Sequence, residues 1–181
     1  MTGQDVFDRY IDAGAFAAAD LVNDMAPGVE LPVLARILAV DPPSVARLVP
    51  ADVPGFVALA HRLREVFADL GRGDVDAAAA RLNNLLAAHP AHPYLAKEGG
   101  RWRVHHHPVD AAVLPMWTAI CAENLARLIG AGEWRRLGTC EAAACERVFL
   151  DESKNSGRRF CSSTCNNRAR SAAYRRRRAT A

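Results

Sequence analysis

Four of the five cysteines in this chain of 181 residues stand as two close pairs. Four residues separate Cys140 from Cys145, fifteen separate Cys145 from Cys161, and three separate Cys161 from Cys165. Two close pairs joined by a loop of this length match the ligand spacing of a tetrahedral zinc site. Each pair would occupy two corners of the tetrahedron, and the loop between the pairs would leave the site, turn and return. We therefore predict one Zn²⁺ held by these four thiolates.

The residues between the two pairs favour a hairpin followed by a helix. A β-prone run over 147–150, a turn cluster over 151–157 and a second strand over 158–160 predict the hairpin. Ser162 or Ser163 is placed to cap a helix that carries the last two cysteines in its first turn. Knuckle, hairpin and helix in this order form a treble-clef-like zinc finger.

The predicted finger is small and its metal is expected to be structural. Four thiolates close the coordination sphere and leave no open position for water. A module of about 40 residues is too small to fold on packing alone, so metal binding should supply most of its folding free energy. The alternatives to a zinc site are chance spacing of the cysteines or a set of redox-active thiols. The main apolar side chains of the predicted finger are Val148, Phe149, Leu150 and Phe160.

Charge is divided unevenly along the chain. Residues 1–133 carry 11 basic and 16 acidic side chains, whereas residues 134–181 carry 12 basic and 4 acidic side chains. Such asymmetry indicates that the basic segment meets a polyanion, while the acidic segment is an ordinary globular body. We therefore predict two domains, 1–133 and 134–181.

Arginines of the basic segment are candidates for contact with nucleic acid. Those on the helix after the last cysteine can neutralise phosphates and release counterions, and some could reach guanine edges in a major groove. The alternatives for the final run of four are a solvated tail, or contact with RNA or a protein. The candidates are Arg158, Arg159, Arg168, Arg170, Arg175, Arg176, Arg177 and Arg178.

Residues 1–133 are predicted to be mainly helical. Half of the chain is hydrophobic, which excludes an intrinsically disordered protein. Over 54–70 the apolar residues recur with the spacing of an amphipathic helix, and Gly99-Gly100 between two β-prone runs predicts a hairpin. The expected fold class is mainly α (α+β), a helical domain with a small β-hairpin before the finger. Further helices are expected over 16–25, 31–40, 42–49, 75–88 and 110–129, the last beginning near Pro115.

Histidines offer the best candidate for a second site in the helical domain. On a strand, His105 and His107 would point to one face and could converge on a ligand or a second metal. The alternative is a polar strand face with one histidine packed inward. Cys121 lies among apolar residues and is interpreted as a core residue. The sequence has no glycine-rich phosphate loop, nucleophile elbow or paired-carboxylate motif, so we do not expect an enzyme.

The sequence also bears on location. Every apolar run is shorter than the roughly 18 residues that a membrane span needs. The first residues lack the basic and then apolar pattern of a signal peptide. We therefore expect a cytoplasmic protein without a membrane partner, in a compartment where clustered cysteines are reduced and bind metal.

Three stretches carry a family resemblance. They read Cys140-x4-Cys145-x3-Phe149-Leu150-Asp151, then Ser153-x-Asn155-x2-Arg158-Arg159-Phe160-Cys161-Ser162, then Cys165-Asn166-Asn167-Arg168. Over roughly 137–178 the chain thereby resembles the CGNR zinc finger, with Asn166 where that family usually has glycine. The helical part, the Gly-Gly hairpin and the helix through Trp117 resemble the ABATE domain, which precedes this finger in bacterial proteins described as stress-induced transcription regulators. The resemblance implies a zinc site at the four cysteines and DNA binding by the C-terminal helix.

The predicted function is that of a zinc-dependent DNA-binding transcription regulator. The finger helix would contact DNA, and the N-terminal domain would form a homodimer or sense a small-molecule effector. Two other functions stay open. The finger could be a protein-interaction module with a structural zinc ion, or the N-terminal domain could bind or transform a small molecule on the His105/His107 face.

Overall fold

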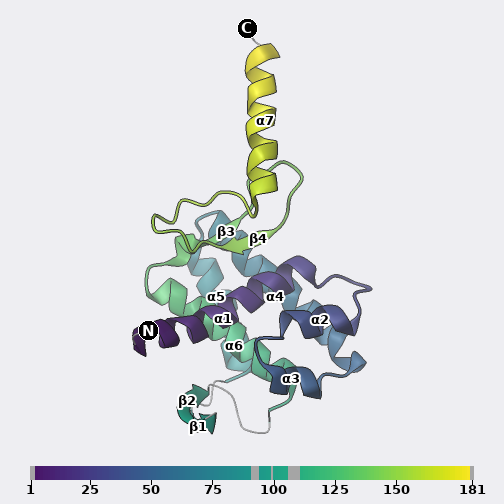
Figure 1. Cartoon of the computed structure of the whole chain (residues 1–181), viewed down its shortest axis with the longest axis vertical. Helices are drawn as coiled ribbons and strands as arrows, with labels where there is room; N and C mark the ends of the chain where they lie inside the picture. Colours follow the sequence, from purple (N-terminus) through teal and green to yellow (C-terminus); the bar gives the residue numbers. More distant parts are fainter. Residues whose placement is uncertain (1–2, 91–93, 99, 106–110, 180–181) are drawn as a thin grey trace.

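The computed structural model describes residues 3–90, 94–98, 100–105 and 111–179. Figure 1 shows a helical body from which α7 projects at one end, while the hairpin of β1 and β2 lies at the other. The chain is therefore mainly α with a small β-hairpin, as predicted. Its elements are α1 (Gly3–Asp24), α2 (Leu31–Ile37), α3 (Pro42–Arg47), η1 (Pro50–Asp52), α4 (Val53–Gly71), α5 (Val75–Ala88), β1 (Tyr94–Glu98), β2 (Arg101–His105), α6 (Val113–Gly130), η2 (Trp134–Arg136), β3 (Leu137–Thr139), β4 (Val148–Leu150) and α7 (Ser163–Ala179).

The core of the body lies among four helices. α4 and α6 each pack against both α1 and α5, and they also contact each other. The stripe of apolar residues predicted over 54–70 is the buried face of α4, and each of its large side chains removed from water contributes about 1.5–3 kcal/mol. Its largest members are Phe56, Leu59, Leu63, Val66, Phe67 and Leu70.

Local signals place several helix ends. The Asp74 carboxylate accepts a hydrogen bond from the backbone N–H of Ala77 at 3.0 Å and caps α5. α6 begins at Val113, so Pro115 falls in its first turn, where a missing N–H costs no hydrogen bond. α1 is longer than expected, because it begins at Gly3. None of the described helices is both long and apolar enough to cross a membrane.

The second sheet differs from the predicted hairpin. β4 pairs antiparallel with β3, which brings Leu137 opposite Leu150, and residues 158–160 form no strand. Both leucines are buried in the core of the body, so burial selects β3 as the partner. The predicted strand is held differently, since the Arg158 N–H donates to the Asp151 carboxylate at 2.7 Å.

Candidate metal centre and nucleic-acid interface

The sulfur atoms of the two cysteine pairs converge on one point. All four Sγ atoms lie within 4.8 Å of one another. Cys145 and Cys165 are each close to Cys161, at Sγ–Sγ distances of 3.8 Å and 3.6 Å, and are 3.8 Å from each other. A tetrahedron with zinc–sulfur bonds of about 2.3 Å has sulfur–sulfur edges of about 3.8 Å. The four side chains therefore fit a single zinc ion.

Short backbone turns put the cysteines in place. The N–H of Cys140, just after β3, donates to the carbonyl of Arg147 at 2.9 Å. The N–H of Cys145 donates to the carbonyl of Ala142 at 3.1 Å and closes the knuckle. At the start of α7 the Ser162 hydroxyl accepts the N–H of Cys165 at 3.2 Å. Ser162 is thus the cap, one of the two serines predicted for it. α7 begins at Ser163, so only Cys165 lies in its first turn, and the prediction that Cys161 lies there too is wrong.

The electrostatics of the cluster favour a cation. Burial raises the pKa of the Cys140 thiol, but hydrogen bonds from the N–H groups of Cys161 and Ala142 outweigh burial and lower this pKa to about 7. Burial and the neighbouring thiols raise the pKa of Cys161 to about 12. Thiols this close cannot all ionise unless a positive charge compensates them, and a divalent metal ion supplies it.

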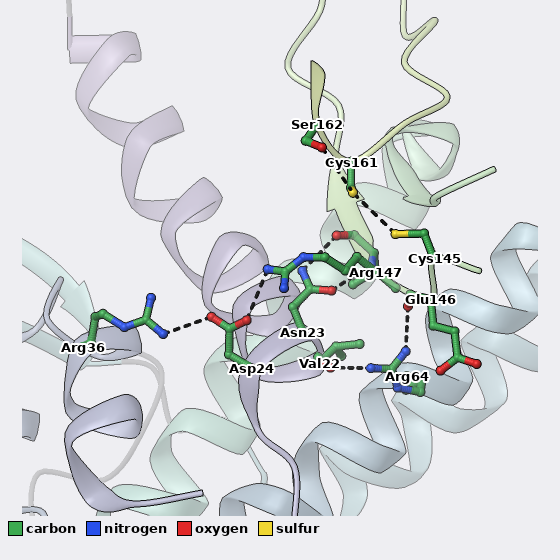
Figure 2. Close-up of polar contacts among 11 residues, drawn as sticks. Val22, Asn23, Asp24, Arg36, Arg64, Cys145, Glu146, Arg147, Cys161 and Ser162 are labelled. Carbon is green, nitrogen blue, oxygen red and sulfur yellow. Dashed lines mark hydrogen bonds and ion pairs between the residues drawn. The ribbon is translucent and has the colours of Figure 1, made fainter. Parts of the chain in front are cut away.

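The finger and the body are joined by side chains that sequence reasoning missed (Figure 2). The Asn23 amide at the end of α1 donates to the carbonyl of Val148 and accepts its N–H, both at 2.9 Å. Arg64 of α4 donates to the carbonyl of Glu146 at 2.8 Å and also to that of Val22. No local pattern in the sequence marks Asn23 or Arg64, because their partners lie far away along the chain.

An ion pair extends the same interface. The Asp24 carboxylate forms ion pairs with Arg147 and with Arg36 of α2, at N–O distances of 3.2 Å and 3.1 Å (Figure 2). Arg36 and Arg147 are largely exposed, so we assign the pairs a positioning role with little stability of their own. Asp24 therefore links the finger to α2 as well as to α1.

The apolar side of the hairpin lies inside the body. Leu137, Val148 and Leu150 belong to the same buried cluster as the helices, and β3 and β4 pack against α4 and α1. The apolar group around the cysteines is separate and small. The prediction that the whole finger needs metal to fold is therefore too broad. The hairpin is stabilised by burial, and only the segment beyond it depends on the cysteine site for its folding.

Removal of the Asn23 amide should weaken this interface. Asn23→Ala leaves a buried N–H and carbonyl of β4 without their partner, so we expect a loss of about 1–3 kcal/mol in the free energy of unfolding. Urea unfolding of the zinc-loaded chain measures it. The matched control is Asn84→Ala, on the exposed side of α5. A loss within the roughly 0.5 kcal/mol typical of surface substitutions would show that the amide does not stabilise the interface.

The Arg158 side chain, although exposed and a candidate for nucleic-acid contact, binds the backbone of its own loop. Its guanidinium donates to the carbonyls of Phe160 and Cys161 and lies 4.8 Å from the ring centre of Phe149. The Asp151 carboxylate accepts the N–H groups of Ser153 and Arg158, at 2.8 Å and 2.7 Å, and stabilises the same loop. Arg158 and Asp151 together shape the approach to the second cysteine pair.

The other candidate arginines fall into two groups. Arg159 forms an ion pair with Glu141 across the knuckle, with Nε 2.8 Å from the carboxylate. Arg168 donates to Cys165 Sγ at 3.7 Å and adds positive charge beside the thiolates. The remaining arginines are exposed along the projecting helix α7 (Figure 1), namely Arg170, Arg175, Arg176, Arg177 and Arg178.

The histidine candidates are not brought together as a described site. His105 ends β2 and is buried, and its ring stacks on Tyr94 with ring centres 5.2 Å apart. His107 lies outside the described residues. The stacking favours the alternative in which one histidine packs inward.

Comparison with known families agrees with the resemblance. Residues 31–132 match the ABATE family, described as "Putative stress-induced transcription regulator", and residues 136–178 match the CGNR zinc finger. A search of curated proteins returns no match. With four cysteines gathered in the matched finger, the predicted single zinc site is confirmed. Since the first match covers more than half of the residues, the chain belongs to the ABATE family and carries a CGNR zinc finger.

Proposed function

We propose that this chain is a zinc-dependent transcription regulator that binds DNA through α7. Cys140, Cys145, Cys161 and Cys165 would hold one Zn²⁺. When bound, the ion neutralises the thiolates and cross-links the knuckle to the first turn of α7. The observation that carries the proposal is the placement of an exposed, arginine-rich helix directly on this cysteine cluster.

The charge of the finger supports a nucleic-acid partner. Residues 153–181 contain no aspartate or glutamate, whereas α7 carries six arginines. Arginines that neutralise phosphates release condensed counterions, which favours binding at physiological salt. The proposed site of action is the cytoplasm, and the proposed partner is duplex DNA.

The body is proposed to carry the regulation. It holds the hairpin of the finger through the backbone of β4, so a ligand bound among its helices, or a second copy of the chain, would act on the base of α7. Because His105 is buried against Tyr94, the structure favours this role over a catalytic histidine face.

Competition binding tests the proposed function. The zinc-loaded full-length chain is mixed with a random duplex library and unlabelled competitor DNA while the salt concentration is raised. We expect a few sequences to be retained against competitor, as for a site-specific regulator. Weak binding to every duplex that disappears by about 200 mM salt would contradict the proposal and indicate purely electrostatic contact.

A further inference from the structure

The arginines of α7 surround the helix axis. At 3.6 residues per turn, Arg170, Arg177 and Arg178 lie within about 60° of Tyr174 around the axis. Arg175 is about 100° from Tyr174, and Arg176 is about 160° away, on the far side of α7. All these side chains are exposed. α7 therefore presents positive charge on several sides, and not along one stripe.

This distribution discriminates between anionic partners. A flat partner, such as a membrane or the acidic face of a protein, meets one side of a helix only. A helix bound to a membrane also needs an apolar face, whereas the small apolar side chains of α7 are alanines. The major groove of duplex DNA, about 12 Å wide, encloses a helix of about 10–12 Å between two phosphate walls and a floor of base edges. A-form RNA has a major groove too narrow for side chains to read.

One face of α7 carries the groups that can read bases. Asn167, Arg170 and Tyr174 form a stripe at spacings of three and four residues, and Arg170 and Tyr174 line one shallow hollow on the helix. An asparagine side chain pairs with adenine and an arginine pairs with guanine in the major groove. The opposite face presents the exposed Arg176 beside Ala169 and Ala172, which are half-buried and offer no side-chain hydrogen bonds.

Resting on the proposed function, we infer that α7 lies lengthwise in the major groove of duplex DNA. Asn167, Arg170 and Tyr174 face the base edges. Arg175 and Arg178 follow one phosphate wall, and Arg177 follows the other. The Arg178 guanidinium lies 5.9 Å from the ring centre of Tyr174 and borders this reading face. Arg170 is the residue that determines sequence preference.

Two single substitutions on the same helix test the assignment. Arg170→Ala should relax the preference at one base pair of the sequence enriched from a random duplex library, and weaken binding to that sequence roughly 5- to 150-fold. Arg175→Ala removes an equal charge from the phosphate side. It should weaken binding to all duplexes alike and leave the base preference unchanged. The slope of log K against log salt should fall by about 0.9. Zinc content, measured for each variant, shows that the finger remains loaded.

Modified duplexes identify the groove. Replacing the guanines of the enriched sequence with 7-deazaguanine removes an acceptor from the major groove. This change should weaken binding of the duplex by the unmodified chain and leave binding by the Arg170→Ala variant unaffected. Specific binding that is insensitive to 7-deazaguanine, or equal effects of the two substitutions on preference, would overturn the groove assignment while DNA binding stands. Equal binding to an RNA duplex or to anionic phosphatidylserine vesicles would also overturn it. Failure to enrich any sequence would instead count against the proposed function.

Discussion

Cys161→Ser is expected to abolish tight zinc binding and to unfold the chain from residue 151 to the end of α7. The substitution removes one of four thiolates from a site whose sulfur–sulfur distances fit a zinc tetrahedron. The loss should exceed the roughly 10–100-fold that the removal of an outer-shell partner costs in metal affinity. α7 has the cysteine cluster at its base and no large buried side chain of its own, so its order depends on the metal.

Hydrogen exchange and zinc analysis measure both effects. Amides of α7 should exchange freely in the variant, while those of β3 and β4 stay protected, because Leu137, Val148 and Leu150 are buried in the body. Cys121→Ala is the matched control, since Cys121 is fully buried in α6 and lies outside the cysteine cluster. Full zinc occupancy together with protected α7 amides in Cys161→Ser would exclude Cys161 as a ligand.

Replacing Arg175, Arg176, Arg177 and Arg178 with alanine should cause the largest loss of DNA affinity among the substitutions on α7. Each arginine that neutralises a phosphate contributes about 0.9 to the slope of log K against log salt. With three or four such contacts, the slope should fall by roughly 2.7 to 3.6. Titrations of one duplex at several salt concentrations give this slope directly.

The corresponding lysine variant separates charge from helix order. Four lysines keep the charge and the helix propensity, so the salt slope should match that of the unmodified chain. The guanidinium fork is lost, and with it any bidentate phosphate contact. An alanine variant with an unchanged slope would identify these four arginines as a solvated tail.

The parts of the fold that could be predicted depend on local rules. Periodicity gives α4 to within a residue or two at each end, and the Asp74 and Ser162 caps are local hydrogen bonds. The zinc site could also be predicted, because metal geometry restricts the spacing of the cysteines. In each case the relevant residues are close neighbours in the sequence or are joined by one short loop.

The parts that could not be predicted are set by distant contacts. The β-prone run at 147–150 is predicted to pair with 158–160, whereas burial of Leu137 against the body makes 137–139 its partner. An arginine in a loop carries no sign of its partners, so the contacts of Arg158 with the carbonyls of Phe160 and Cys161 could not be predicted. The pairing of Asn23 with Val148 spans 125 residues and leaves no pattern in either segment.

The anchoring of the finger on the body has a mechanical consequence. Asn23 and Arg64 form hydrogen bonds with the backbone at and beside β4. α7 extends away from this contact and is about 25 Å long at 1.5 Å per residue. The hairpin is thus the point about which α7 would rotate relative to the body. A tilt of α7 by about 10° at the hairpin displaces the C-terminal end of α7 by roughly 4 Å, which is more than one base-pair step of about 3.4 Å. Under the proposed function, small shifts between α1 and α4 would thereby be amplified into a change of register along DNA.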